Sequence, residues 1–348
     1  MTGETSEKSS LLTADHYMLQ EMTRRFAENQ FPPEVLQGDR TELEHRRDVA
    51  WLELSALGLT GLMIDEVNGG SGGTLTDACV VAESLASELA PLPYVASCIA
   101  GVAILSHCGG GPDDLRRVAS GEKYSLLVDR AIDWPPQSPP IAWGWSRDSR
   151  LIGIGRDGRA SVATAQTNVV DDWFDSLQSM TLVTDVVQPG GAIDDGATRA
   201  LAIARVGCAA QLLGLAGRAM EDAVSYAKQR EQYGQLIGSF QAVQHLCAEM
   251  LVDVETSRSV VYGAAAVVEF ADVREAQRAG AVAKAWTSEA ALRVCETSIQ
   301  VLGGIGITRE HMAHLRLRDA HLFARAFGRP SAIYRDLAVQ QMTLSSAS

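Results

Sequence analysis

The sequence lacks an excess of basic residues, paired cysteines and an obvious leader segment. Its 30 lysines and arginines are outnumbered by 43 aspartates and glutamates, a net charge of −13, which argues against nucleic acid or an anionic membrane as the main partner. Six scattered cysteines include no Cys-x-x-Cys pair, so buried, reduced thiols are expected. No basic-then-apolar segment opens the chain and no uninterrupted apolar run reaches bilayer length. These absences predict a soluble cytoplasmic protein without a membrane span.

Signatures of several enzyme classes are missing as well. There is no P-loop and no elbow motif of a Ser-His-Asp hydrolase. His311 and His314 lie beside Glu310 without further ligands at suitable spacing, so no metal site is expected. Glu249 and Glu255 belong to the polar side of a helical pattern and are expected to be solvated or paired.

Hydrophobic periodicity divides the 348 residues into four parts. A disordered polar tail (1–12) precedes a helical domain (13–120), in which helices over 43–57 and 74–89 are stopped by Gly58 and by the proline-containing segment 90–94. A small β domain (121–192) has short strands at 125–128, 151–155, 160–164 and 181–187, and its first half is expected to carry loops. Helices over 202–226, 240–262 and 276–302 predict an antiparallel bundle (193–348). The predicted fold class is mainly α with a small β domain.

Two C-terminal blocks combine residues that suit a flat, phosphate-bearing cofactor. The first runs from Arg230 to Gly234 and continues with Phe240-Gln241, and the second runs from Gln300 to Gly306. A guanidinium suits a pyrophosphate, and glycines allow close approach. In order and spacing these blocks resemble the C-terminal flavin-binding segments of the acyl-CoA dehydrogenase family.

The resemblance implies FAD as cofactor and a helical domain, a middle β-barrel-like domain and a C-terminal four-helix bundle. It also implies that the two blocks reach the FAD of a neighbouring chain. Arg230 would contact the pyrophosphate, Gln232 and Tyr233 the flavin nucleotide, Phe240 and Gln241 the adenine side, and Gln300, Gly303 and Gly304 the adenosine and pyrophosphate. Each residue has a plainer alternative: Arg230 could cap a helix, Gly303 and Gly304 could end one, and Phe240 could lie in the core.

The catalytic base of the family has no counterpart in this chain. Desaturation between Cα and Cβ needs a base for the α-proton and a flavin to accept the hydride, and the resemblance places that base, a glutamate, at one of two positions. Phe327, after Arg318-Asp319-Ala320, occupies the commoner one, and Ala204, before Arg205, occupies the other. Neither side chain accepts a proton.

Other residues that would serve the chain's own flavin are also altered. Arg329-Pro330-Ser331 stands where the family has a phosphate-contacting Thr-Ser. The proline-rich segment from Trp134 to Pro140 replaces the loop that lines the isoalloxazine. Trp143, Trp145 and Trp173 could stack on a ring, but aromatic residues in a small β domain are more often core.

The resemblance therefore implies a non-catalytic subunit of a hetero-oligomeric acyl-CoA dehydrogenase, similar to the actinobacterial α2β2 enzymes that act on steroid side-chain CoA thioesters. A homologous catalytic subunit would carry the glutamate and bind most of the acyl-CoA, and an electron-transferring flavoprotein is the family's usual oxidant. Two alternatives stay open: a self-sufficient homo-oligomeric dehydrogenase with a displaced base, and a flavin-free structural subunit.

Overall fold

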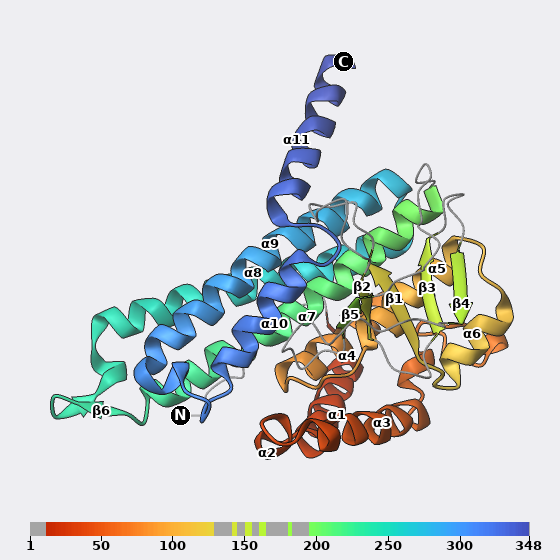
Figure 1. Ribbon diagram of the computed structural model, residues 1–348. Helices are drawn as coiled ribbons and strands as arrows, with labels where there is room; N and C mark the ends of the chain where they lie inside the picture. The colour runs from red at the N-terminus through yellow and green to blue at the C-terminus, as the bar shows by residue number, and fades with distance from the viewer. Residues whose placement is uncertain are drawn as a thin grey trace.

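The computed structural model describes residues 12–128, 141–144, 150–154, 160–164, 180–182 and 195–347. In chain order these form a helical N-terminal region, a small sheet and a bundle of long helices (Figure 1). This architecture confirms the predicted fold class. The domain boundaries at residues 13, 121 and 193 stay predictions.

The N-terminal region opens with α1 (Ala14–Gln30), α2 (Pro33–Leu36) and α3 (Arg40–Ala56). Side-chain caps set the starts of the two longer helices, since Thr13 accepts from the His16 N–H at 3.4 Å and Asp39 accepts from the Thr41 N–H at 2.8 Å. Gly58 follows α3 with φ of 77°. The predicted stop at this glycine is confirmed.

A glycine-rich turn joins α3 to α4 (Leu75–Ser87) through the short helices η1 (Leu59–Gly61) and η2 (Glu66–Asn68). A Cβ atom at Gly70 would lie 2.0 Å from the carbonyl oxygen of Ile64, so glycine is needed for the turn to close on itself. Beyond α4 come the π-type helix η3 (Val95–Gly101), α5 (Val102–His107) and α6 (Pro112–Ala119).

The sheet consists of β1 (Tyr124–Val128), β2 (Ile141–Trp143), β3 (Arg150–Ile154), β4 (Ala160–Thr164) and β5 (Met180–Leu182), in the order β4-β3-β1-β2-β5. β1 and β3 pair in parallel, and the other pairs are antiparallel. The expectation that the first half of this region carries loops rather than pleated core is wrong for β2. This strand is too short to show alternation, and it exists because it pairs with β1 and β5.

The bundle is built from α7 (Asp195–Ala227), α8 (Gln241–Phe270), α9 (Val273–Leu302) and α10 (Ala313–Arg325). Arg199, near the start of α7, donates to the carbonyl oxygen of Val268 near the end of α8 at 2.7 Å, so these helices are antiparallel. Ser298 donates to Ala219 O at 2.7 Å, which places the ends of α9 and α7 together. The last helix, α11 (Pro330–Ala347), projects from the bundle (Figure 1).

Helix α7 is the centre of the bundle. By length and composition it could span a bilayer, but 89% of its apolar window is buried inside the protein, as in the core helix of a folded domain. Its neighbours include α4 on one side and α8, α9 and α10 on others. The cysteines agree with expectation: all six are free, and five are buried while Cys247 is half-buried.

Candidate functional site

The first predicted block forms a β-hairpin at one end of the bundle. β6 (Glu231–Gln232) pairs with β7 (Gln235–Leu236), and η4 (Ile237–Ser239) leads into α8. Tyr233 and Gly234, the two turn residues, have φ of 56° and 77°. Positive φ at both positions is the geometry of a type I′ turn, which matches the twist of paired strands. The hairpin extends beyond the ends of α7 and α8 (Figure 1).

Arg230 is held by its backbone while its side chain stays available. Its N–H donates to Tyr226 O at 2.9 Å and its carbonyl accepts from the Ile237 N–H at 2.8 Å. The guanidinium is exposed and makes no hydrogen bond or ion pair with any residue that the structure describes. Arg230 is therefore not a capping residue, and its charge is free for a ligand or another chain.

The neighbouring polar and aromatic residues face solvent too. The side chains of Gln241 and Gln300 are exposed and have no partner in the described part of the chain, whereas Gln232 donates to the Glu231 carbonyl at 2.8 Å. Tyr233 is 94% exposed, and its ring meets the half-buried Phe240 edge-on with centroids 6.4 Å apart. Phe240 is thus not a core residue.

The second predicted block reaches the same end of the bundle because α9 ends beside α7. α9 stops at Gly303, whose φ is 63°, and η5 (Gly303–Ile307) follows. Gly303 is therefore a helix C-cap, which is the structural role that the sequence left open beside a cofactor contact. Gly304 differs, because its φ is not positive, and a Cβ atom there would meet nothing within 4 Å. Within the described residues, packing does not explain why this position is glycine.

These predicted contacts lie toward the same end of the bundle and are here called the hairpin edge; all are exposed except the half-buried Phe240: Arg230, Gln232, Tyr233, Phe240, Gln241, Gln300, Gly303 and Gly304. It brings together an unpaired cation, amide groups, an aromatic ring and an open glycine. Such groups suit the phosphates and the flat rings of a nucleotide. The chemistry fits the predicted cofactor.

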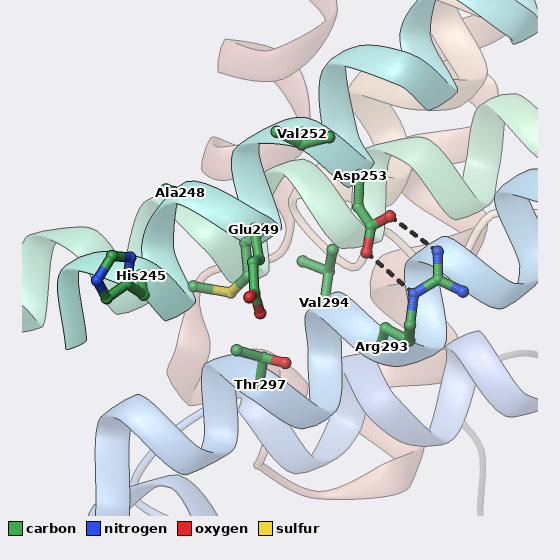
Figure 2. A pocket seen from close by; sticks show the side chains of 9 residues that line it. His245, Ala248, Glu249, Val252, Asp253, Arg293, Val294 and Thr297 are labelled. Atoms are coloured by element: carbon green, nitrogen blue, oxygen red, sulfur yellow. Dashed lines mark hydrogen bonds and ion pairs between the residues drawn. The ribbon is translucent and has the colours of Figure 1, made fainter. Parts of the chain in front are cut away.

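A groove of about 460 Å³ lies between α8 and α9. Figure 2 shows Glu249 of α8 pointing toward Val294 and Thr297 of α9, and His245, Ala248 and Val252 of α8 also line the groove. Its far end is marked by a two-pronged ion pair in which Arg293 donates to Asp253 at 2.8 and 3.1 Å. His245, which lines the groove, lies one helical turn beyond Gln241 of the hairpin edge. Periodicity predicted the helix over 240–262 with Glu249 and Glu255 on its polar side, and it did not predict this groove.

The two positions of the missing base meet at the other end of the bundle. Ala204 is buried in α7, and the next residue, Arg205, donates from Nε to the carbonyl oxygen of Phe327 at 3.1 Å. Phe327 is half-buried with φ of 57°. Its ring contacts Trp143 of β2, with centroids 5.8 Å apart. Neither position has a carboxylate, and Arg205 was not predicted to join them.

The remaining candidates from the sequence either make structural hydrogen bonds or lie outside the described residues. His311 Nδ1 accepts from the Ala313 N–H at 3.1 Å, and His314 Nδ1 lies 2.8 Å from His311 O, so both histidines serve a turn. No group of three or more potential metal ligands occurs among the described residues. Trp145, Trp173 and the segment 134–140 lie outside them.

Comparison with known proteins gives the family. The N-terminal domain of acyl-CoA dehydrogenases matches residues 13–111 and their C-terminal domain matches residues 195–342. This chain belongs to the acyl-CoA dehydrogenase family. The match covers both helical regions, including the hairpin edge and both base positions. The family is one of oxidoreductases.

Relatives among acyl-CoA dehydrogenases include two from mycobacteria. IpdE2 of Mycolicibacterium smegmatis is 31% identical over 332 residues, which cover 94% of this chain and 98% of that protein. FadE34 of Mycobacterium tuberculosis is 34% identical over 285 residues, 77% of this chain, but the match spans only 38% of FadE34.

Solved structures share the fold. A Tcur3481–Tcur3483 steroid acyl-CoA dehydrogenase has a TM-score of 0.82 at 23% identity, covering 96% of this chain and 99% of that one. Butyryl-CoA dehydrogenase from Megasphaera elsdenii has a TM-score of 0.75 at 21% identity, covering 95% and 99%.

Proposed function

We propose that this chain is the non-catalytic subunit of a hetero-oligomeric acyl-CoA dehydrogenase. Its hairpin edge contributes contacts to an FAD whose remaining site, with the catalytic glutamate, belongs to a homologous partner subunit. The FAD supplies hydride acceptance when bound, and this chain supplies groups that hold it.

One observation carries the proposal: the hairpin edge and the base positions lie at opposite ends of the bundle. From Ala204 to the end of α7 at Ala227, a rise of about 1.5 Å per residue gives roughly 35 Å. Arg205 binds the Phe327 carbonyl, so both base positions share the far end. A single extended FAD does not bridge this distance. The hairpin edge therefore suits a flavin whose reactive ring lies in another chain.

Because this chain has no catalytic base, we infer that its partner is an unlike chain. In a homo-oligomer every site would present Phe327 and Ala204, and neither can take the α-proton. An unlike partner that carries the glutamate completes the reaction. The names of the similar proteins favour a bulky CoA thioester, since the Tcur3481–Tcur3483 enzyme is described as a steroid acyl-CoA dehydrogenase. A steroid side-chain acyl-CoA is the substrate class we propose.

Co-expression with candidate homologous subunits tests this function. The purified complex should hold one FAD for each pair of unlike chains. Arg230→Ala should lower the flavin content of the complex while leaving its mass unchanged. Arg278→Ala is the matched control, because Arg278 is also an exposed arginine without a partner among the described residues, at the other end of α9. It should leave flavin content unchanged.

Two results would overturn the proposal. A homogeneous homo-oligomer with one FAD per chain, reduced by acyl-CoA, would establish a self-sufficient dehydrogenase with a displaced base. An assembled complex whose flavin content is indifferent to Arg230→Ala would establish a structural subunit.

A further inference from the structure

Three donors bind carbonyl groups at the end of α10 and just beyond it. Cys208 Sγ lies 3.4 Å from Phe323 O, Lys284 Nζ donates to Ala324 O at 3.0 Å, and Arg205 Nε donates to Phe327 O at 3.1 Å. The last carbonyls of a helix have no partner within it, and cations there complement the helix dipole. These three donors of α7 and α9, Arg205, Cys208 and Lys284, are here called the clamp.

Phe327, whose carbonyl the clamp binds, has an unusual backbone conformation. Its φ of 57° is uncommon for a residue other than glycine, and rarer still for a bulky one. Both Arg205 and Lys284 are buried, and burial lowers the pKa of each. Burying two cations opposes folding unless they are well bonded. The fold therefore retains two buried cations whose hydrogen bonds hold the backbone at Ala324 and Phe327.

Phe327 completes a cluster of three rings between the sheet and the bundle. The Trp143 indole lies 5.2 Å from the Phe323 ring and 5.8 Å from the Phe327 ring, centroid to centroid. Trp143 is 1% exposed and Phe323 is fully buried. Among the described residues the Trp143 Nε1–H has no acceptor. Packing on the two phenylalanines, and not a hydrogen bond, therefore places the indole.

We propose that Trp143, Phe323 and Phe327 form an aromatic plug that closes this chain's own acyl-CoA site, with Arg205, Cys208 and Lys284 as its positioning residues. This inference rests on the proposed function, because it explains why the thioester binds on the partner alone. The missing glutamate is then not the only change at this site, because the plug closes it as well. A carboxylate restored by Phe327→Glu still faces the Trp143 ring, and no space opens for a thioester.

A photoreactive CoA thioester with an aryl azide on its acyl chain tests the plug in the assembled complex. Peptides labelled by the probe are identified by mass spectrometry. In wild-type protein the label should be absent from residues 195–205 and 313–328 of this chain. In the double variant Trp143→Ala with Phe327→Gly, label should appear there. Glycine suits the positive φ at this position, which limits the damage to the fold. Phe270→Ala, at an exposed phenylalanine, is the matched control.

The positioning role has its own readout. Arg205→Ala should release the plug and allow labelling, whereas Arg205→Lys keeps a donor and should stay unlabelled. A merely structural role would not separate these two variants in complexes of equal stability.

Labelling of the wild-type chain in either segment overturns the plug, even if the double variant fails to fold. A folded double variant that remains unlabelled overturns it as well. Failure of the proposed function is seen separately, in subunit composition and flavin content. The plug lies far from the hairpin edge, so its variants should leave both unchanged. If the chain proves to be a homo-oligomer, the same labelling is performed on that assembly, with the same criteria.

Discussion

The phenol of Tyr262 donates a hydrogen bond to the buried carboxylate of Glu83, and Arg258 donates to the same carboxylate at 2.5 Å. Glu83 belongs to α4, and the other two residues belong to α8. This buried acid with two donors is one of the contacts that join the N-terminal helical region to the bundle. A buried charge is retained only when it is paired and hydrogen-bonded.

Removing this charge should destabilise the fold more than removing one donor. Breaking a buried pair costs about 3–5 kcal/mol, and Arg258 is 24% exposed, so Glu83→Gln should fall near the lower end. Tyr262→Phe leaves the ion pair in place and should cost about 1.5–3 kcal/mol. Urea unfolding monitored by circular dichroism measures both. Equal losses would mean that the ion pair contributes nothing beyond the phenol.

The same junction depends on close backbone packing at Gly214. A Cβ atom there would lie 2.1 Å from the carbonyl oxygen of Glu83. Gly214→Ala should push α4 away from α7 and cost about 1–3 kcal/mol. Gly217→Ala is the matched control on α7, because a Cβ atom at Gly217 meets nothing within 4 Å. This control should be neutral or stabilise the protein by up to about 1 kcal/mol.

A double-mutant cycle extends this prediction. Gly214→Ala displaces the backbone that carries Glu83, so its effect and that of Glu83→Gln should not add, with a coupling of roughly 0.5–3 kcal/mol. Additive losses would show that the two contacts act independently.

Lys284 should give the unfolding free energy a distinct pH dependence. Burial lowers its pKa from 10.5 to about 8. Between these values the unfolded chain binds more protons at this site than the folded chain, so Lys284 raises the free energy of unfolding as pH increases. Below pH 8 its charged form opposes folding by a constant amount.

Lys284→Met removes this contribution. The stability of the variant relative to wild type should be highest below pH 8 and should decline by at most about 1.4 kcal/mol per pH unit above it. Urea midpoints at several pH values from 7 to 10 provide the measurement, with Lys228→Met, at an exposed position, as control. A difference that is flat across this range would contradict the burial of an ionisable amine.

Helix ends could be predicted from the sequence where a capping side chain or a glycine with positive φ determines them. Thr74 caps α4 by accepting from the Asp77 N–H at 3.2 Å, and Gly58 ends the preceding helical segment with positive φ. β2 was missed because its pairing partners lie elsewhere in the chain. The clamp on Phe327 was invisible for the same reason: Arg205 and Phe327 are 122 residues apart. The motifs indicated which residues a flavin would need, but not that the Arg230 side chain has no partner among the described residues or that a groove lies between α8 and α9.

Substitutions at Gly304 and Gly303 distinguish a glycine that a bound molecule needs from one that the fold of the chain needs. A Cβ atom there meets nothing within 4 Å, so Gly304→Ala should change the free energy of unfolding by no more than about 0.5 kcal/mol. Gly303→Ala places alanine at φ of 63° and ψ of −137° and should cost roughly 1–3 kcal/mol. If the hairpin edge holds a flavin of the partner subunit, Gly304→Ala should still lower the flavin content of the complex, because the added methyl occupies the space of the approaching nucleotide. Absorbance of released flavin, normalised to protein, measures this beside urea unfolding. A complex of Gly304→Ala with full flavin content would show that nothing approaches the backbone at this glycine.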